Sequence, residues 1–185
     1  AVKRTRAEKF AGGTVAVANH VANLVGKTGL ATILGTHNTQ EDFILESLDQ
    51  RVDFRPSYRE DSPTIVKQRF IEDYFFSKLM AVYDFNDSPL LEHDDEKFCA
   101  SLRKILPEYD VVVAVDYGHG TMTEGVIELL SSEAKFLAVN AQSNAGNLGY
   151  HTISTYPRMD FACITENEAR QEARDRRGDI HTIAD

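Results

Sequence analysis

The sequence predicts an α/β fold built on a parallel β-sheet, and three observations support this. The Val-rich run 110–116 shows no polar alternation, which is typical of a strand buried on both faces. It leads through a turn containing Gly118 and Gly120 into a helical period over 121–130. Two β-rich runs, 63–71 and 79–85, are joined by a short polar and aromatic link, which predicts an antiparallel hairpin. We therefore expect alternating strands and helices with a hairpin inserted at about 63–86.

The other elements are expected in order along the chain. Before the hairpin, the patterns indicate a helix over 15–25, a strand over 30–34, a helix from 38 or 39 through 48, and an extended piece over 52–55. After it, they indicate a helix from 94 or 95 to 106, strands over 135–140 and 159–164, and a helix opening at Thr165. Residues 178–185 resemble the start of another strand. Because the chain starts without Met and ends in that pattern, both ends are interpreted as cuts through a longer polypeptide.

The composition is that of one ordinary globular domain of 185 residues, 42% apolar and 26% charged. A net charge of −9 and a pI near 5.1 argue against a nucleic-acid or membrane-surface partner, because such proteins concentrate Lys and Arg on one face. Cys99 and Cys163 lack CxxC spacing and are expected to be reduced core residues. With no long apolar run in the sequence, these features predict a cytoplasmic protein.

Asp116 is the first candidate site residue, because it stands at the end of the Val-rich strand. Ligands of parallel sheets bind beyond the carboxyl ends of the strands. Gly118 and Gly120 would let the backbone approach a ligand closely. The alternative is that Asp116 only caps the turn, which Asp does commonly.

Four further features carry two interpretations each. Gly12 and Gly13 at a helix start could receive an anion or a sugar hydroxyl, or could simply turn a corner. Lys67 and Arg69 share one strand face and could clamp a phosphate, or could protect an exposed edge strand. The loop 141–149 is rich in amides that could bind hydroxyls or phosphate oxygens, or could simply form a loop. Glu168 has capping-box spacing from Thr165, and could alternatively orient a metal-bound water.

Taken in order, these motifs resemble those of the ribokinase-like (PfkB) sugar kinases. The nearest resemblance is to the heptose-7-phosphate kinase part of bifunctional heptose kinase/nucleotidyltransferase proteins. The residues that carry it are Gly12-Gly13, the run from Pro63 to Arg69, Asp116 to Gly120, and Thr165 to Glu168.

The resemblance implies a three-layer, Rossmann-like sheet with a β-hairpin lid over the sugar, and transfer of the γ-phosphoryl group of ATP to a sugar hydroxyl with Mg²⁺. Gly12 and Gly13 would lie against the sugar, and Lys67 and Arg69 near a sugar phosphate. Asp116 would lie near the phosphoryl-transfer centre. Glu168 would lie in the outer shell of the metal. Sugar phosphate and ATP are thus the expected partners, and a fused nucleotidyltransferase domain is possible.

The chain departs from the family pattern at several positions. The Asn expected three residues after the glycine pair is Ala16, and Asn19 or His20 one turn later could substitute. His119 replaces the usual basic residue of the turn after Asp116. Asn140 stands where the family has the Asp of Asp-Pro-Lys and is expected to contact substrate, and Thr165 replaces an Asn.

The Gly-Ala-Gly-Asp segment that supplies the catalytic base in the family is also missing from this sequence. We therefore expect the chain to be the central part of a sugar-kinase domain, inactive by itself. The alternative is a kinase-derived binding or oligomerisation domain that has lost catalysis. Apolar residues of the hairpin further predict a homodimer through the lid, since large apolar patches seldom stay solvated; they are Phe70, Phe75, Phe76, Val82 and Tyr83.

Overall fold

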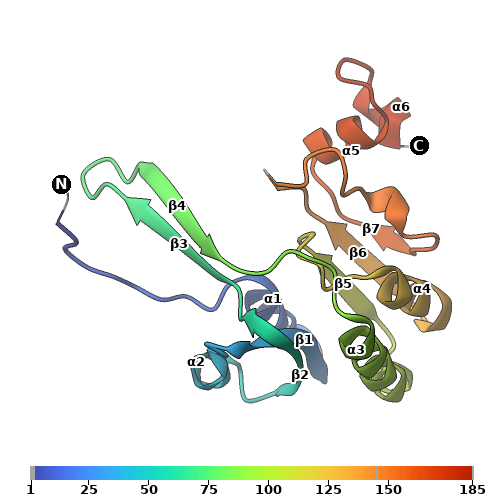
Figure 1. The fold of residues 1–185 in the computed structure, drawn as a ribbon. Helices are drawn as coiled ribbons and strands as arrows, with labels where there is room; N and C mark the ends of the chain where they lie inside the picture. The colour runs from blue at the N-terminus through green and yellow to red at the C-terminus, as the bar shows by residue number, and fades with distance from the viewer. Residues whose placement is uncertain (1–2, 145, 185) are drawn as a thin grey trace.

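The computed structural model describes residues 3–144 and 146–184, and it has the predicted α/β architecture (Figure 1). Parallel strands and helices form two packed halves, and an antiparallel hairpin extends from the first half. No helix in the described part of the chain is long and apolar enough to cross a membrane.

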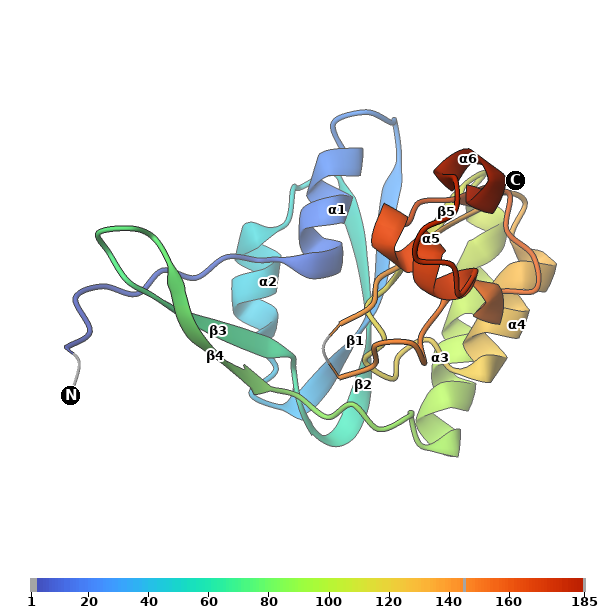
Figure 2. The same cartoon turned by 90° about the horizontal axis from the view of Figure 1, so that it is seen from above.

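The first half contains α1 (Gly13–Val21), β1 (Thr28–His37), α2 (Glu41–Ser47) and β2 (Val52–Pro63), with β1 and β2 paired in parallel. Side chains of β1 alternate between two cores. Leu30 and Leu34 pack with α1 and α2, whereas Ala31 and Ile33 pack against the core of the second half. The strand pair therefore lies between two helical layers, as Figure 2 shows from above.

Several boundaries in this half differ from the prediction. Strand β1 covers Thr28–His37 rather than 30–34. Helix α1 ends at Val21, followed by turns, rather than continuing to residue 25. Strand β2 runs through Pro56 to Pro63, although only 52–55 was expected to be extended. Among the described strands β2 pairs only with β1, so it is an edge strand, where the missing N–H of a proline is tolerated.

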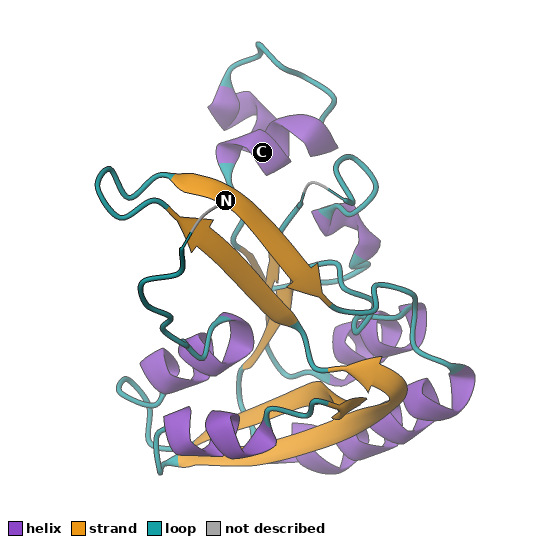
Figure 3. Ribbon diagram, turned by 60° about the vertical axis from the view of Figure 1, so that its left-hand side comes forward, coloured by secondary structure: helices purple, strands orange, loops and turns teal. Residues whose placement is uncertain are grey.

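The predicted hairpin is present as β3 (Val66–Ile71) and β4 (Lys78–Asp84), paired antiparallel. Figure 3 shows it as a two-stranded ribbon that leaves the body of the molecule. Most of its side chains are exposed on both faces, including Phe75 at 78% and Leu79 at 63%. The ribbon therefore has little core of its own and depends on its attachment at the base.

The second half contains α3 (Glu92–Ile105), the 3₁₀ turn η1 (Leu106–Glu108), β5 (Val112–Asp116), α4 (Glu124–Glu133), β6 (Leu137–Ala141) and the 3₁₀ turn η2 (Ile153–Thr155). Strands β5, β6 and β7 (Phe161–Ala162) form a parallel sheet in that order. Helices α3 and α4 cover one face, where the largest core is fully buried around Val126, Leu137 and Val139.

The other face of this sheet corrects the expectation that the central strand is buried on both sides. Val111 and Val113 are 54% and 47% exposed, because no described element covers them. Strand β7 is also shorter than the expected run 159–164. Cys163, expected in the core, is exposed, whereas Cys99 is buried as expected.

The last helices, α5 (Glu166–Glu172) and α6 (Ile180–Ala184), follow β7. The Thr165 and Glu168 capping box is confirmed at the start of α5. The predicted strand at 178–185 is wrong, since 180–184 is helical and residue 185 lies outside the described part. Asp179 explains the helix, because its Oδ1 accepts hydrogen bonds from the backbone N–H groups of His181 and Thr182.

Candidate functional site

The centre of the candidate site is Asp116 at the carboxyl end of β5, where the residue is only 2% exposed. Its Oδ1 accepts a hydrogen bond from the backbone N–H of Gly118 at 2.9 Å, and its Oδ2 accepts one from the Tyr156 hydroxyl at 2.9 Å. His151 Nε2 lies 3.2 Å from Oδ1, within ion-pair distance, although its N–H does not point along a straight hydrogen bond. The bond from Gly118 N is the turn-capping contact expected of Asp116. The contact with His151 makes Asp116 part of a buried charged cluster as well.

The pKa values of His151 and Tyr156, which both contact Asp116, are shifted. The contact with Asp116 raises the pKa of His151 against the opposing effect of burial. Burial, reinforced by the Asp116 carboxylate, raises the pKa of Tyr156. Tyr156 is therefore a neutral donor, and His151 is a cation over more of the physiological range than a free histidine.

The turn after Asp116 requires glycine at two positions. Gly118 and Gly120 have φ angles of +64° and +80°, in the region that L side chains rarely adopt. A Cβ at Gly120 would lie 2.3 Å from the carbonyl oxygen of Ser88, in the segment that returns from the hairpin. The turn is therefore packed against the base of the hairpin.

Lys67 of the hairpin reaches this turn. Its Nζ lies 2.8 Å from His119 Nε2, and it lies 5.3 Å and 6.0 Å from the ring centres of Tyr83 and Tyr117. Burial, with a smaller effect of Arg69, lowers the pKa of Lys67. Two motifs that are 52 residues apart in the sequence thus meet at one place.

The start of α1 also lies near this turn, through Gly13 of the glycine pair. A Cβ at Gly13, whose φ is +58°, would be 3.6 Å from the Tyr117 ring, while one at Gly12 would meet nothing within 4 Å. The first N–H groups of α1 therefore lie close to Tyr117, with open space beside Gly12.

The loop after β6 folds back onto the turn. Gln142 N donates to the Asp116 carbonyl at 2.8 Å, and Asn144 Nδ2 donates to the Tyr117 carbonyl at 3.0 Å. Asn147 Nδ2 is buried without a hydrogen-bond partner in the described part of the chain. The predicted amide-rich loop is thus brought beside Asp116, although residue 145 lies outside the described residues.

Glu168 lies at the far side of this loop. Its Oε1 accepts from Ser143 N at 2.8 Å, and its Oε2 accepts from the N–H and hydroxyl of Thr165, both at 2.8 Å. Burial opposes ionisation, but these hydrogen bonds lower the pKa of Glu168 overall. The carboxylate therefore ties the loop to α5.

The described residues do not form a direct Mg²⁺ site, because they contain no cluster of three or more His, Cys, Asp or Glu side chains placed to hold a metal ion. Glu168 Oε1 accepts only one hydrogen bond from the described residues and retains acceptor capacity. A contact with a metal-bound water, the role that the resemblance implies for Glu168, stays a prediction.

Three predicted site residues lie apart from this cluster. Asn19 donates from Nδ2 to the Ser47 carbonyl and accepts from Asp49 N, both at 2.8 Å, so its amide joins α1 to the end of α2. Asn140 donates to the Cys163 carbonyl at 2.6 Å, which links β6 to the end of β7. Arg69 is exposed on the hairpin, two residues closer to its tip than Lys67.

His151 and Tyr156 are site residues that the sequence analysis missed. Tyr156 is 40 residues from Asp116 and lies just after η2, where no periodic pattern marks it. A histidine following an amide-rich loop was the only available signal, and it is weak.

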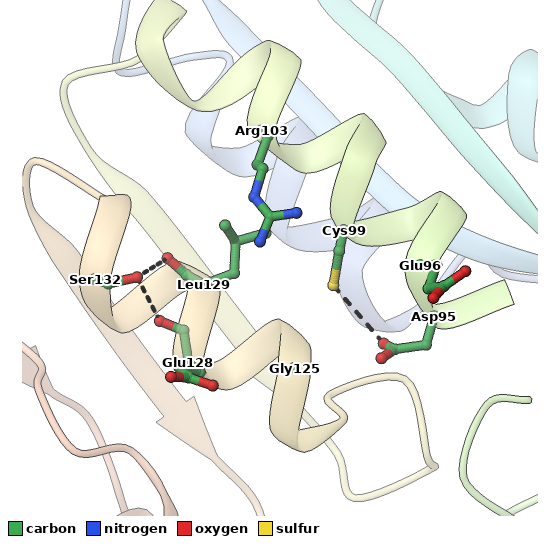
Figure 4. A pocket seen from close by; sticks show the side chains of 8 residues that line it. All are labelled: Asp95, Glu96, Cys99, Arg103, Gly125, Glu128, Leu129 and Ser132. Carbon is green, nitrogen blue, oxygen red and sulfur yellow. Dashed lines mark hydrogen bonds between the residues drawn. The ribbon is translucent and has the colours of Figure 1, made fainter. Parts of the chain in front are cut away.

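A groove of about 410 Å³ lies elsewhere, on the outer surface between α3 and α4 (Figure 4). Asp95 in this groove accepts hydrogen bonds from Thr123 Oγ1 at 2.5 Å and from Cys99 Sγ at 3.8 Å. Burial, followed by the nearby Asp95 carboxylate, raises the pKa of the Cys99 thiol, which keeps it protonated and unreactive. The hydrogen bond from Thr123, the N-cap of α4, joins α4 to α3.

The fold is an α/β fold of the ribokinase-like type. The chain is similar to the solved structure of ribokinase from Giardia lamblia, with a TM-score of 0.57 and 13% identity over 84% of this chain and 47% of that one. It is also similar to a pyrophosphate-dependent kinase in the ribokinase family, solved with a pyrophosphate analog and myo-inositol. Here the TM-score is 0.51 and the identity 17%, over 86% of this chain and 55% of that one.

The chain thus spans about half the length of both structures. At these identities the similarity shows the fold, and the predicted ribokinase-like class is confirmed at that level. No protein-family model matches the chain. No curated protein matches it either.

Proposed function

We propose that this chain carries the acceptor side of a kinase that phosphorylates a sugar or sugar phosphate, resembling a heptose phosphate, with ATP and Mg²⁺. The observation that carries the proposal is the meeting of three elements at the carboxyl end of β5. They are the start of α1 at Gly13, the hairpin at Lys67 and the turn from Asp116 to Gly120. Carboxyl ends of parallel strands are the usual ligand sites of such sheets.

The chemistry assigned to each group is positioning and charge, which dominate phosphoryl transfer. Lys67 supplies a cation for a phosphate on the acceptor, and the N–H groups near Gly12 and Gly13 bind hydroxyls. Asp116, with both oxygens occupied by protein donors, holds the turn in place. The 185 residues contain no Gly-Ala-Gly-Asp segment, so we expect this chain alone to bind the acceptor without turnover.

Thermal unfolding with a panel of ligands tests the proposal. The panel contains heptose and hexose phosphates, myo-inositol, Mg-ATP and pyrophosphate, the last because one similar structure is a pyrophosphate-dependent kinase. A ligand at about a hundred times its Kd adds roughly 2.7 kcal/mol. This corresponds to a rise in Tm of roughly 5 to 11 °C for a domain of this size.

Matched variants make the test specific to the site. Lys67→Met should abolish the shift with a sugar phosphate, while Lys97→Met, an exposed lysine on α3, should leave it unchanged. An equal shift in both variants would contradict the assignment of Lys67. A chain that responds to no sugar, sugar phosphate or nucleotide would favour the alternative, a catalytically inactive binding or oligomerisation domain.

A further inference from the structure

The contact between Lys67 and His119 is the only side-chain hydrogen bond that joins β3 or β4 to another element in the described part of the chain. The other polar contacts of the hairpin with the rest of the described chain lie at its base, apart from an exposed ion pair of 3.8 Å between Arg6 Nη2 and Asp73 Oδ1 in its connecting loop. Thr64 Oγ1, just before β3, accepts from Gly35 N at 2.9 Å, and Arg59 donates to the carbonyls of Asn86 and Ser88 just after β4. Lys67 and His119 are therefore the polar pair that holds the start of β3 against the turn after Asp116.

Both side chains of this pair can carry a proton and a positive charge. A lysine ammonium has three donors and no acceptor, so its partner must offer a lone pair. His119 can do so only in its neutral form, with the proton on the other ring nitrogen. When both side chains are charged, the 2.8 Å contact becomes a repulsion.

We propose that His119 is a positioning residue whose neutral imidazole holds Lys67 and the base of the hairpin against the turn after Asp116, so that protonation of His119 releases the hairpin from this turn. The inference rests on the proposed function only in naming this place an acceptor site. The turn of the similar kinases normally carries a basic residue at this position, which could not accept a hydrogen bond from Lys67. The pH-dependent contact is therefore a feature of this chain.

The surroundings of His119 determine the direction of the effect. Burial is the main cause that lowers the pKa of His119, and Lys67 and His151 lower it further, whereas Asp87 and Asp116 oppose them. The Phe85 ring packs on the imidazole with centroids 5.0 Å apart. The pKa of His119 is lower when it is paired with Lys67 than when it is free. The stability that the contact gives to the base of the hairpin is therefore complete above the ordinary histidine pKa of about 6.5, and it is lost as the pH falls through the lowered pKa.

Hydrogen exchange of this 185-residue chain between pH 8 and pH 4.5, corrected for the intrinsic rate, tests the proposal without any substrate. A two-stranded ribbon alone is marginally stable, so its release should raise exchange in β3 and β4 by about tenfold. Exchange in α4 should stay unchanged and serves as the internal control. NMR titration of the histidine rings should place the pKa of His119 below the ordinary histidine value of about 6.5.

The variants separate positioning from mere packing. His119→Gln retains an acceptor that does not titrate, so the ribbon should stay protected at every pH, while His119→Lys should release it at every pH. Lys67→Met should release it as well and return the pKa of His119 toward its ordinary value. The control His20→Gln should behave as the wild type.

Equal protection of the wild-type ribbon at both ends of the pH range would overturn the proposal. So would a pH dependence that survives in His119→Gln. Because none of these readouts uses a sugar or nucleotide, a negative result here leaves the proposed function standing, and failure of the ligand panel leaves this contact standing.

Discussion

Asp116 is a buried carboxylate whose two oxygens both receive protein donors, one from its own turn and one from the distant Tyr156. A buried charge is tolerated only when such donors replace water. The local bond to Gly118 N fixes the turn, and the bond to Tyr156 ties the turn to the segment that follows η2. Loss of the second donor should therefore affect stability as well as the site.

We expect Tyr156→Phe to lower the free energy of unfolding by about 1 to 3 kcal/mol, because it leaves Asp116 Oδ2 without its buried donor. Urea unfolding at neutral pH measures the effect. Tyr150→Phe is the matched control, since Tyr150 is 91% exposed and its loss should change the stability by no more than about 0.5 kcal/mol. Equal stability of the two variants would mean that Oδ2 takes its hydrogen bond from water.

Among the elements, β1 and β2 are in close backbone contact where β1 passes the end of β2. The parallel register shifts between Gly35 and His37. A Cβ at Gly35 would lie 2.1 Å from the Ser62 carbonyl oxygen and 2.2 Å from the carbonyl carbon of Pro63. Both are backbone atoms of the segment that leads into the hairpin, so this glycine fixes how the hairpin leaves the body.

Gly35→Ala should lower the free energy of unfolding by about 1 to 3 kcal/mol or more, the usual effect of overpacking. The reason is that the added Cβ would meet backbone atoms, which cannot move aside as a side chain can. Gly26→Ala is the control, since a Cβ there would meet nothing within 4 Å. Thermal unfolding compares the two. An unchanged Tm for Gly35→Ala would show that the two strands can separate locally without loss of packing.

At the scale of the whole molecule, the hairpin presents an apolar face that the rest of the described chain leaves uncovered. Lys67 is paired with Tyr83 and Arg69 with Ala81, which places these four on one face. Phe70, Met80 and Val82 lie on the opposite face and are 42%, 53% and 45% exposed. Exposed apolar surface of this kind is typical of an interaction site.

We expect the chain to form a homodimer through this face of the ribbon, which leaves the Lys67 face toward the site. Light scattering at increasing concentration should show the mass of a dimer for the wild type. The double variant Met80→Lys and Val82→Lys should remain monomeric, because the added charges cannot be buried at a symmetric contact. Leu24→Lys, at a site 73% exposed on another surface, should still dimerise, and a monomeric wild type would contradict the prediction.

Patterns among neighbouring residues were enough to predict the features that depend on short-range interactions. The alternation of apolar runs predicted the parallel α/β class, the β-branched and aromatic runs predicted the hairpin, and the spacing of Thr165 and Glu168 predicted a capping box. Each depends on groups within one turn or one strand, so the signal lies in neighbouring residues. The carboxyl-edge position of Asp116 followed from the same pattern, since parallel strands all end at one edge.

The tertiary structure alone decided which side chains meet. His151 and Tyr156 contact Asp116, Lys67 contacts His119, and Asn19 is occupied by the end of α2, all across separations of 28 residues or more. Strand β2 could pass through Pro56 only because it lies at a sheet edge, and the Val113 face of β5 is open because no described element packs on it. Such outcomes depend on where distant segments pack, and packing between distant segments leaves no periodic trace in the sequence.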